Sequence, residues 1–383
     1  MAGFLKIRSV EVCEFRQEVR EVATAPIYAP GAVRDATMTA IRIETDAGIA
    51  GEHVTYAGLE AAGARQVAQS LIGRNALERE KIYQDLKRVL RQVARIGIAA
   101  IDIALWDLAG KYYNAPVYEL LGGYRTKLPC YASTFHADDA PNGLSSPEAF
   151  ADFAEQCLQM GYKAFKLHTW WEGPIEREIA TIRAVGKRVG GKMALMLDPA
   201  SGYETLTDAV LVGRACDEQG FYWYEDPYKD TGVAHLAHRK LRELIKTPIL
   251  QAEHVRGLED RANFITADAT DLVRGDVEYD GITATMKLAN AAEALGIDIE
   301  IHIGTVPSRH CMAAIRNSNF LEWGLVHPRV ENGFPCFPPG YDAIRLDAID
   351  AEGRIAVPSG PGLGVQADWG YIRDRVVSRT IFE

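Results

Sequence analysis

The sequence predicts an α/β fold: a (β/α)8-type barrel, or modified TIM barrel, with an N-terminal α+β capping domain. Eight short apolar runs alternate with helix-length stretches between residues 129 and 323, at intervals of roughly 20–33 residues. This spacing indicates parallel strands joined by crossover helices, and eight such units fit a barrel better than an open sheet. The first 125 residues instead show three strand-like runs followed by helical periodicity, which is typical of an α+β unit.

The predicted cap begins with strands. In residues 5–16 apolar and polar side chains alternate, as in a strand with one buried face. Asp46-Ala47-Gly48 has the composition of a hairpin turn. Residues 22–35 contain two prolines and a glycine, which predicts a loop. The remaining strands are expected at 36–45 and 49–55, and helices at about 59–71, 76–93 and 96–113.

The barrel strands are expected in the eight apolar runs. These runs are residues 129–134, 162–169, 193–199, 221–227, 247–254, 272–277, 298–303 and 320–323. The final stretch returns to strand-like pieces, and we expect it to pack back on the N-terminal unit. The predicted domains are therefore a cap of residues 1–127, completed by 341–383, and a barrel domain of residues 128–340.

The composition excludes several classes of protein. The 383 residues are 48% hydrophobic and 25% charged, which is a globular and not a disordered profile. The net charge of -10 argues against a nucleic-acid-binding protein, and no apolar run is long enough to cross a membrane. The six cysteines form no CxxC pair, so we expect free thiols, no structural zinc site and a cytoplasmic protein. No signal peptide is visible.

Ionisable side chains lie at the ends of most barrel runs. A single acid there would be interpreted as a helix cap. A whole ring is different, because each group follows an apolar stretch where a charge is costly unless it is paired or metal-bound. The carboxyl ends of barrel strands meet at one mouth, where active sites lie. The residues concerned are Lys166, His168, Asp198, Glu225, Glu253, Asp276, His302 and Glu322.

Three of these acids lie on successive strands. Barrel geometry would bring Asp198, Glu225 and Glu253 to one side of the mouth, where like charges repel and raise each pKa. A divalent cation would remove that repulsion. Hard oxygen ligands suit Mg²⁺, with Mn²⁺ as an alternative, so the pattern predicts a metal site.

Proton-transfer groups are expected on both sides of this site. Asp276 and His302 end the sixth and seventh strands, and an Asp bonded to one imidazole nitrogen makes the other a better base. Lys166 and His168 point to the same face of the second strand. Apolar surroundings and a nearby metal are expected to lower the pKa of Lys166. Lys166 could alternatively be a salt-bridge partner of a metal-site carboxylate, and His168 could hydrogen-bond or transfer a proton.

Together these motifs resemble the enolase superfamily, in its mandelate racemase/muconate lactonising enzyme branch. The resemblance covers nearly the whole chain. It rests on AIDIALWDLAGKYYNAPVYELLGG (100–123), LDP (197–199), YEDP (224–227), QAEH (251–254), DGIT (280–283), IHIGT (301–305), LEW (321–323) and PSGPGLGV (358–365).

The resemblance implies a cap that closes over a modified barrel, and roles for the strand-end residues. It implies Asp198, Glu225 and Glu253 as Mg²⁺ ligands and Asp276–His302 as a His–Asp dyad. Glu322 matches the acid that hydrogen-bonds the substrate carboxylate, and Lys166 matches the first lysine of a Lys-x-Lys motif. His168 replaces the second lysine, and the sixth-strand motif is one residue out of step with the family spacing.

The implied chemistry is abstraction of the proton next to a carboxylate, through an enediolate. Loss of a β-hydroxyl would then make the protein an acid-sugar dehydratase, a lyase, that yields a 2-keto-3-deoxy acid. Return of the proton to the opposite face would make it a racemase or epimerase, an isomerase. A catalytically silent barrel that binds a metabolite is the third alternative.

Substrate contacts are expected from the cap and from the second barrel loop. The candidates are Tyr28, Arg34, Tyr56 and Trp170. The two tyrosines could instead pack the cap against the barrel, and Trp170 could be an interface residue. The expected partner is a small carboxylate, with no nucleic acid or membrane, and the resemblance implies a homo-oligomer.

Overall fold

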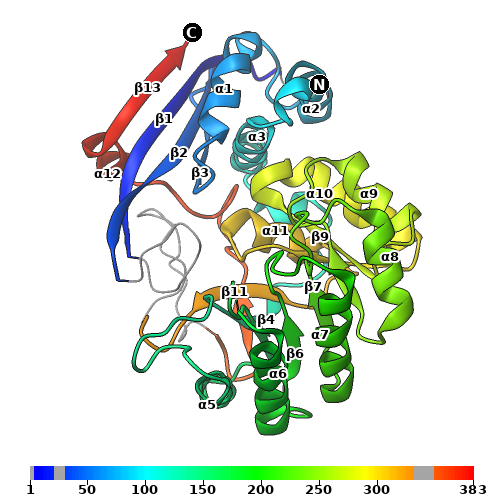
Figure 1. Ribbon diagram of the computed structural model, residues 1–383. Coiled ribbons are helices and arrows are strands. Elements are labelled where there is room, and N and C mark those ends of the chain that lie inside the picture. The colour runs from blue at the N-terminus through cyan, green and yellow to red at the C-terminus, as the bar shows by residue number, and fades with distance from the viewer. Residues whose placement is uncertain (1–3, 21–30, 172, 331–348) are drawn as a thin grey trace.

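The computed structural model describes residues 4–20, 31–171, 173–330 and 349–383. It contains two sheets, and in Figure 1 the antiparallel sheet with its helices lies above the barrel. In the barrel the strands are hydrogen-bonded in the order β10-β9-β8-β7-β6-β5-β4-β11, which follows the chain apart from the last neighbour. They are β4 (Lys127–Thr134), β5 (Ala164–Leu167), β6 (Ala194–Leu197), β7 (Trp223–Glu225), β8 (Ile249–Gln251), β9 (Leu272–Gly275), β10 (Asp298–Ile301) and β11 (Leu321–Val326).

All eight predicted runs form strands, and the pairs along this order are parallel. The sheet curls so that β10 returns towards β11: Ile299 N donates to Asn317 O over 2.8 Å, and Glu300 accepts from the backbone of Asn319 and Phe320. Six of the eight strands are shorter than the apolar runs, because the ladder ends while the run continues, whereas β4 and β11 are longer than their runs. His168, Asp198 and Glu253 therefore lie just beyond a strand end.

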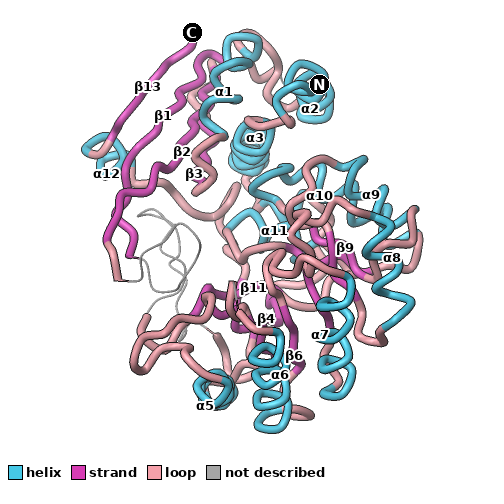
Figure 2. Tube along the Cα trace, viewed as in Figure 1, coloured by secondary structure: helices cyan, strands magenta, loops and turns pink. Residues whose placement is uncertain are grey.

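Helices cover the outside of the barrel, as Figures 1 and 2 show. Three of them begin at Ser146, Thr205 and Thr305, whose hydroxyls accept a backbone N–H of the first turn. The α10 helix contains a kink at Gly281, whose φ is +83°. The helices are α5 (Pro147–Gln159), α6 (Ile175–Val189), α7 (Leu206–Gln219), α8 (His235–Leu244), α9 (Leu258–Thr266), α10 (Val277–Ala294) and α11 (Val306–Ala314).

Inside the barrel, side chains two residues apart on a strand form two layers. The lower layer is an apolar cluster of Tyr131, Ala164, Met196, Trp223, Leu250 and Leu272. Two residues further along five of these strands come Ser133, Lys166, Asp198, Glu225 and Arg274, whereas after β8 Ala252 has a φ of +91° and packs in the main hydrophobic core. Since alternate residues of a strand share a face, this upper layer lies at the mouth, about 6–7 Å above the lower one.

The cap contains an antiparallel sheet of order β13-β1-β2-β3. The hairpin between β2 and β3 closes with Thr45 N donating to Ile49 O, and Gly48 in it has a φ of +74°. The predicted loop 22–35 lies mostly outside the described residues. The elements are β1 (Ile7–Arg20), β2 (Val33–Thr45), β3 (Ala50–Thr55), β13 (Val376–Phe382), α1 (Glu60–Ala68), α2 (Arg79–Val89) and α3 (Ile98–Tyr113), with 3-10 turns η1 (Gln69–Leu71) and η2 (Leu90–Val93).

The α3 helix joins cap and barrel. Most of its side chains are buried, since it packs on the cap sheet with one face and on α10 with another. Asp102 accepts hydrogen bonds from the backbone N (2.9 Å) and the hydroxyl (2.5 Å) of Thr283. Asp107 accepts from Glu52 N and from Leu363 N, each over 2.8 Å. The short helix α4 (Val117–Leu120) follows.

The C-terminal segment contacts both units. β13 pairs antiparallel with β1 of the cap, whereas β12 (Arg354–Ala356) pairs antiparallel with β4 of the barrel. The helix between them is α12 (Trp369–Asp374). The division into a cap of 1–127 with 341–383 and a barrel of 128–340 stays a prediction.

Five of the six cysteines lie in the described residues, and all five are buried free thiols. Burial and the neighbouring Glu11 raise the pKa of Cys13 to about 12. Among the described residues no helix has both the length and the hydropathy needed to cross a bilayer.

Candidate active site

A buried lysine lies at the centre of the barrel mouth. Lys166 Nζ is 2.9 Å from Asp198 Oδ2, 3.1 Å from Glu225 Oε2 and 2.9 Å from Glu322 Oε1. All four side chains are buried. The amine thus lies among three carboxylates that come from different strands or strand ends.

The expected lowering of the Lys166 pKa is wrong for this arrangement. Burial alone would lower the pKa, but Glu225, Glu322 and Asp198 outweigh burial and raise it well above its usual value. The sequence could not show this, because the shift depends on how closely the three carboxylates surround the amine. A cation bound to the same carboxylates would oppose the shift.

Three acids at the mouth have the geometry of a metal site. Asp198, Glu225 and Glu253 each offer a carboxylate oxygen, and these oxygens lie within 4.8 Å of one another. Burial raises the pKa of Glu225, and Asp198 and Glu253 add to this effect. Because all the donors are hard oxygens, the residues fit a divalent cation such as Mg²⁺.

Arg274 on β9 is a member of the mouth that the sequence analysis did not single out. Its Nε donates to Glu225 Oε1 over 2.6 Å, and its Nη2 lies 3.3 Å from the hydroxyl of Tyr131. The guanidinium lies above the Trp223 ring, 5.8 Å from its centroid. The signal was present, since Arg274 precedes Asp276 by two positions and so shares its face of the strand.

His302 and Asp276 lie on the other side of Glu253. His302 Nδ1 is 2.7 Å from Asp276 Oδ2, and His302 Nε2 is 3.4 Å from Glu253 Oε1. Burial lowers the pKa of His302, but Glu253 and Asp276 outweigh it and raise this pKa to about 9. The other oxygen of Asp276 accepts from Tyr279 N and caps α10, which fixes the carboxylate towards the imidazole.

His168 follows β5 and faces two oxygens. Its Nδ1 lies 2.6 Å from Thr134 O and its Nε2 lies 3.0 Å from Asp198 Oδ2. Since both neighbours are acceptors, His168 satisfies both contacts only when both ring nitrogens carry hydrogen. The ring of His136, which the sequence analysis did not consider, is 5.1 Å away.

Glu322 on β11 completes the mouth. One oxygen accepts from the Ser133 hydroxyl over 2.8 Å, and the other accepts from Ile303 N over 2.9 Å. Burial raises its pKa, but Lys166 and Arg274 outweigh burial and hold the pKa far below its usual range. Glu322 is therefore a carboxylate that accepts hydrogen bonds in this arrangement.

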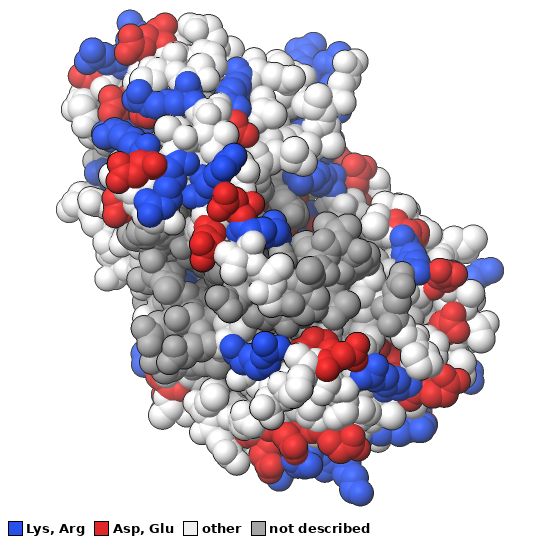
Figure 3. Space-filling model, turned by 60° about the vertical axis from the view of Figure 1, so that its left-hand side comes forward, with Lys and Arg blue, Asp and Glu red and all other residues white. Residues whose placement is uncertain are grey.

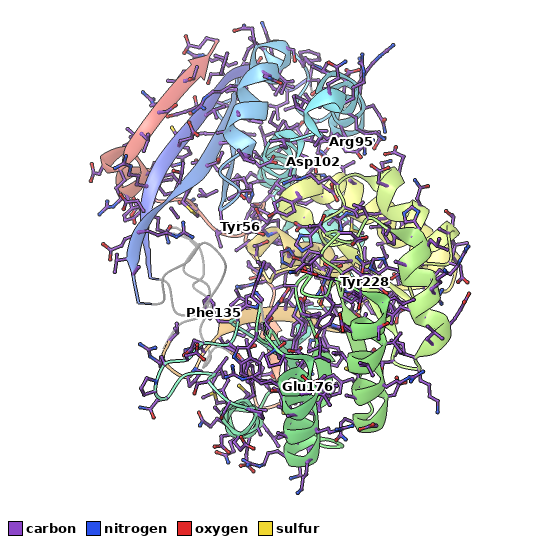
Figure 4. The ribbon with its side chains drawn as sticks, in the orientation of Figure 1. Tyr56, Arg95, Asp102, Phe135, Glu176 and Tyr228 are labelled. Atoms are coloured by element: carbon purple, nitrogen blue, oxygen red, sulfur yellow. The ribbon has the colours of Figure 1, made fainter. Side chains whose placement is uncertain are left out.

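The three candidate substrate residues that the structure describes are dispersed. Tyr28 lies outside the described residues. Arg34 is an exposed residue of β2. Tyr56 lies on the side of the cap that faces the barrel (Figure 4), with its ring 6.5 Å from that of Tyr279. Trp170 packs on Phe150 and under the Arg177 guanidinium, and it lines a cavity of about 380 Å³.

Figure 3 shows one outer face of the molecule. Lysine, arginine and acidic side chains are interspersed over its described residues and are not separated by sign.

Comparison with known proteins gives matches along most of the chain. Residues 149–371 match the family described as enolase C-terminal domain-like, and residues 13–122 match the mandelate racemase/muconate lactonizing enzyme N-terminal domain. A structure of D-glucarate dehydratase from Agrobacterium tumefaciens complexed with magnesium is 30% identical, with a TM-score of 0.85. The match covers 98% of this chain and all of that one.

Curated relatives catalyse more than one kind of reaction. D-xylonate dehydratase from Haloferax volcanii is 25% identical, over 92% of each chain. N-succinyl-L-Arg/Lys racemase from Bacillus cereus is 27% identical, over 78% of this chain and 79% of its own. Relatives of this chain thus include both dehydratases and racemases.

Proposed function

Because the chain belongs to the mandelate racemase/muconate lactonizing enzyme family of the enolase superfamily, we propose that it removes the proton next to a carboxylate group of an acid sugar and dehydrates that sugar. The observation that supports this most directly is the placement of two proton-transfer groups around one acidic cluster. Lys166 contacts Asp198 and Glu225, and the Asp276-supported His302 contacts Glu253. A cation held by these acids would lie between two bases.

Asp198, Glu225 and Glu253 would hold the metal ion, with Mg²⁺ as the best fit and Mn²⁺ as the alternative. A bound divalent cation polarises the carboxylate of the substrate and stabilises the negative charge that develops in the transition state. Arg274 keeps one oxygen of Glu225 occupied. This contact orients the carboxylate, so that its other oxygen is presented towards Asp198 and Lys166.

The proton next to the carboxylate is taken by Lys166 or His302, according to which face of the carbon carries it. Either group acts as a base only after it loses its own proton, and in the structure both have a raised pKa. Asp276 holds the ring of His302 and stabilises the imidazolium that forms. Glu322, which is ionised beside Lys166, would donate a hydrogen bond to the substrate carboxylate only after taking up a proton.

Dehydration then needs an acid on the β-hydroxyl. A protonated His302 or His168 would donate to this oxygen, the C–O bond breaks and water leaves. The resulting enol takes up a proton at carbon to give the 2-keto-3-deoxy acid. We assign His168 to the β-hydroxyl of the substrate because its two ring nitrogens already contact oxygen atoms at the mouth, those of Thr134 and Asp198. The dehydratase relatives make this outcome the first candidate.

Racemisation or epimerisation is the second candidate. Two bases around one site can remove a proton from one face and return it to the other, and one curated relative is a racemase. Such a reaction would use the same first step, without loss of the hydroxyl.

The test is a panel of aldonates and aldarates, incubated in D₂O with the protein and Mg²⁺. Formation of a 2-keto acid supports the dehydratase, and NMR exchange at the α-carbon without keto acid supports the isomerase. Lys166→Met and His302→Asn should lose activity by about 10²–10⁴-fold. Lys163→Met changes an exposed lysine on the same segment and serves as the control. Full activity of both mouth variants would contradict the proposal.

A further inference from the structure

A second group of potential metal ligands lies beside the acid triad. Asp226, Glu253 and His254 each offer one ligand atom, and these atoms lie within 4.8 Å of one another. Asp226 follows β7, while Glu253 and His254 follow β8. Because β7 and β8 are neighbours in the barrel, their ends are held together by the ladder.

The separations within this group suit a shared ion. His254 Nε2 lies 3.7 Å from Asp226 Oδ2 and 3.8 Å from Glu253 Oε1. Both distances are too long for hydrogen bonds. They are, however, ordinary for two ligand atoms that are each about 2.0–2.2 Å from the same ion.

Independent evidence comes from polar side chains that lack partners. Asp226 is 1% exposed, and neither of its carboxylate oxygens has a hydrogen-bond partner. Gln251 is fully buried, and its amide oxygen and nitrogen also have no partner. A methyl group added at Gly232 would lie 2.1 Å from Gln251 Nε2 and 3.4 Å from Asp226 Oδ1, so the two side chains converge there. A buried carboxylate in this state needs a proton or a cation.

This group has its own route to solvent. His254 is partly exposed and lines a cavity of about 530 Å³ together with Val233, His235 and Arg256. A hydrated ion can therefore reach His254 from outside the barrel mouth, and Asp226 lies behind it, buried. The mixed imidazole and carboxylate donors favour Mn²⁺ or Zn²⁺ over Mg²⁺.

We propose that Asp226, Glu253 and His254 bind a second divalent cation of the Mn²⁺ or Zn²⁺ class, with Glu253 bridging the two sites. Glu253 Oε1 lies 3.4 Å from His302 Nε2 and 3.8 Å from His254 Nε2, so the same oxygen lies between the imidazole of the first site and that of the second. The proposal goes beyond the proposed reaction and shares only Glu253 with it.

The test counts Mn²⁺ ions on the full-length protein, by the EPR signal of free Mn²⁺ and by calorimetry. We expect two ions per chain in the wild type, and one in Asp226→Asn and in His254→Gln. Asp226→Asn removes a buried charge without a change of shape, and asparagine tolerates the φ of +33° at this position. His254→Gln alters a partly exposed side chain, so it serves if the first variant does not fold.

Two further variants make the result specific. His235→Gln changes another imidazole of the same cavity and should keep both ions. Asp198→Asn should lose the triad ion and keep the second, so failure of the triad and failure of the second site give different results. A wild type that binds one Mn²⁺, with an affinity that His254→Gln leaves unchanged, would overturn the proposal.

Discussion

The upper and lower layers of the barrel interior are built on the same strands and contain opposite kinds of side chain. The lower layer of Tyr131, Ala164, Met196, Trp223, Leu250 and Leu272 is apolar and buried. Two residues further along the strands, the side chains are equally buried, but they are charged. They are Lys166, Asp198, Glu225 and Arg274. The lower layer is stabilised by removal from water. The upper one is stable only because each charge has an opposite neighbour, and this dependence is typical of functional sites.

The largest effect is expected from the dyad at the mouth. Asp276→Asn should lower kcat/KM by roughly 10⁴-fold, because the amide no longer holds the correct tautomer of His302. The variant should keep the α10 cap through its amide oxygen and therefore unfold at nearly the wild-type temperature. The α-proton exchange rate and thermal unfolding measure the two effects. If Asp276→Asn exchanged the α-proton at the wild-type rate, Asp276 would not act on His302.

The next test removes one charge from the upper layer. Arg274→Met removes one of the two buried cations that contact Glu225 and leaves only Lys166, so it should lower the free energy of unfolding by about 3–5 kcal/mol. The matched control is Arg183→Met, because Arg183 pairs with Glu218 in an exposed position, so its loss should change the free energy of unfolding far less than the loss of Arg274. Urea unfolding of the two variants compares them. If both variants lost the same unfolding free energy, the buried pair would not stabilise the fold more than the exposed pair.

In the lower layer, truncation should cost stability without any effect of charge. Met196→Ala leaves a cavity in a fully buried cluster and should lower the free energy of unfolding by about 2–5 kcal/mol. Met160→Ala, at a position that is 45% exposed, is the control and should change it by about 0.5 kcal/mol or less. The loss in Met196→Ala should be the same at low and high salt.

A smaller and pH-dependent effect is expected from Glu300, which is a buried acid on β10. Burial raises its pKa from 4.5 to about 7. An acid with a raised folded-state pKa stabilises the fold below pH 4.5, and this stabilisation is lost as the pH rises through 7. The loss is on the order of 3 kcal/mol, at about 1.4 kcal/mol per pKa unit. In Glu300→Gln the unfolding free energy should decrease less between pH 5 and 8 than in the wild type. An unchanged pH dependence would show that the pKa of Glu300 is not raised.

The strand-end residues were predictable from the sequence because two simple rules combine there. Alternate residues of a strand share a face, and parallel barrel strands end at the same mouth. These rules correctly bring Lys166, Asp198, Glu225 and Glu322 together. The eight apolar runs predicted the strands for the same reason, since buried parallel strands need continuous apolar sequence.

Other features depend on packing that the sequence does not show. The raised pKa of Lys166 depends on three distances, and Arg274 has a role only because Glu225 lies beside it. The unpartnered carboxylate of Asp226 could not be distinguished in sequence from an ordinary loop acid. β12 pairs with β4, which is far away in the sequence. An alternating pattern predicts a strand but does not show which other strand it pairs with.

The helix α3 has a consequence for how the molecule responds to heat. It is bonded to the barrel through Asp102 (Figure 4) and to the cap sheet and the C-terminal segment through Asp107. If the two sheets melted separately, α3 would lose one of its packed faces and buried carboxylates would lose their donors. The chain should therefore show a single calorimetric peak, and its two halves should refold as one cooperative unit.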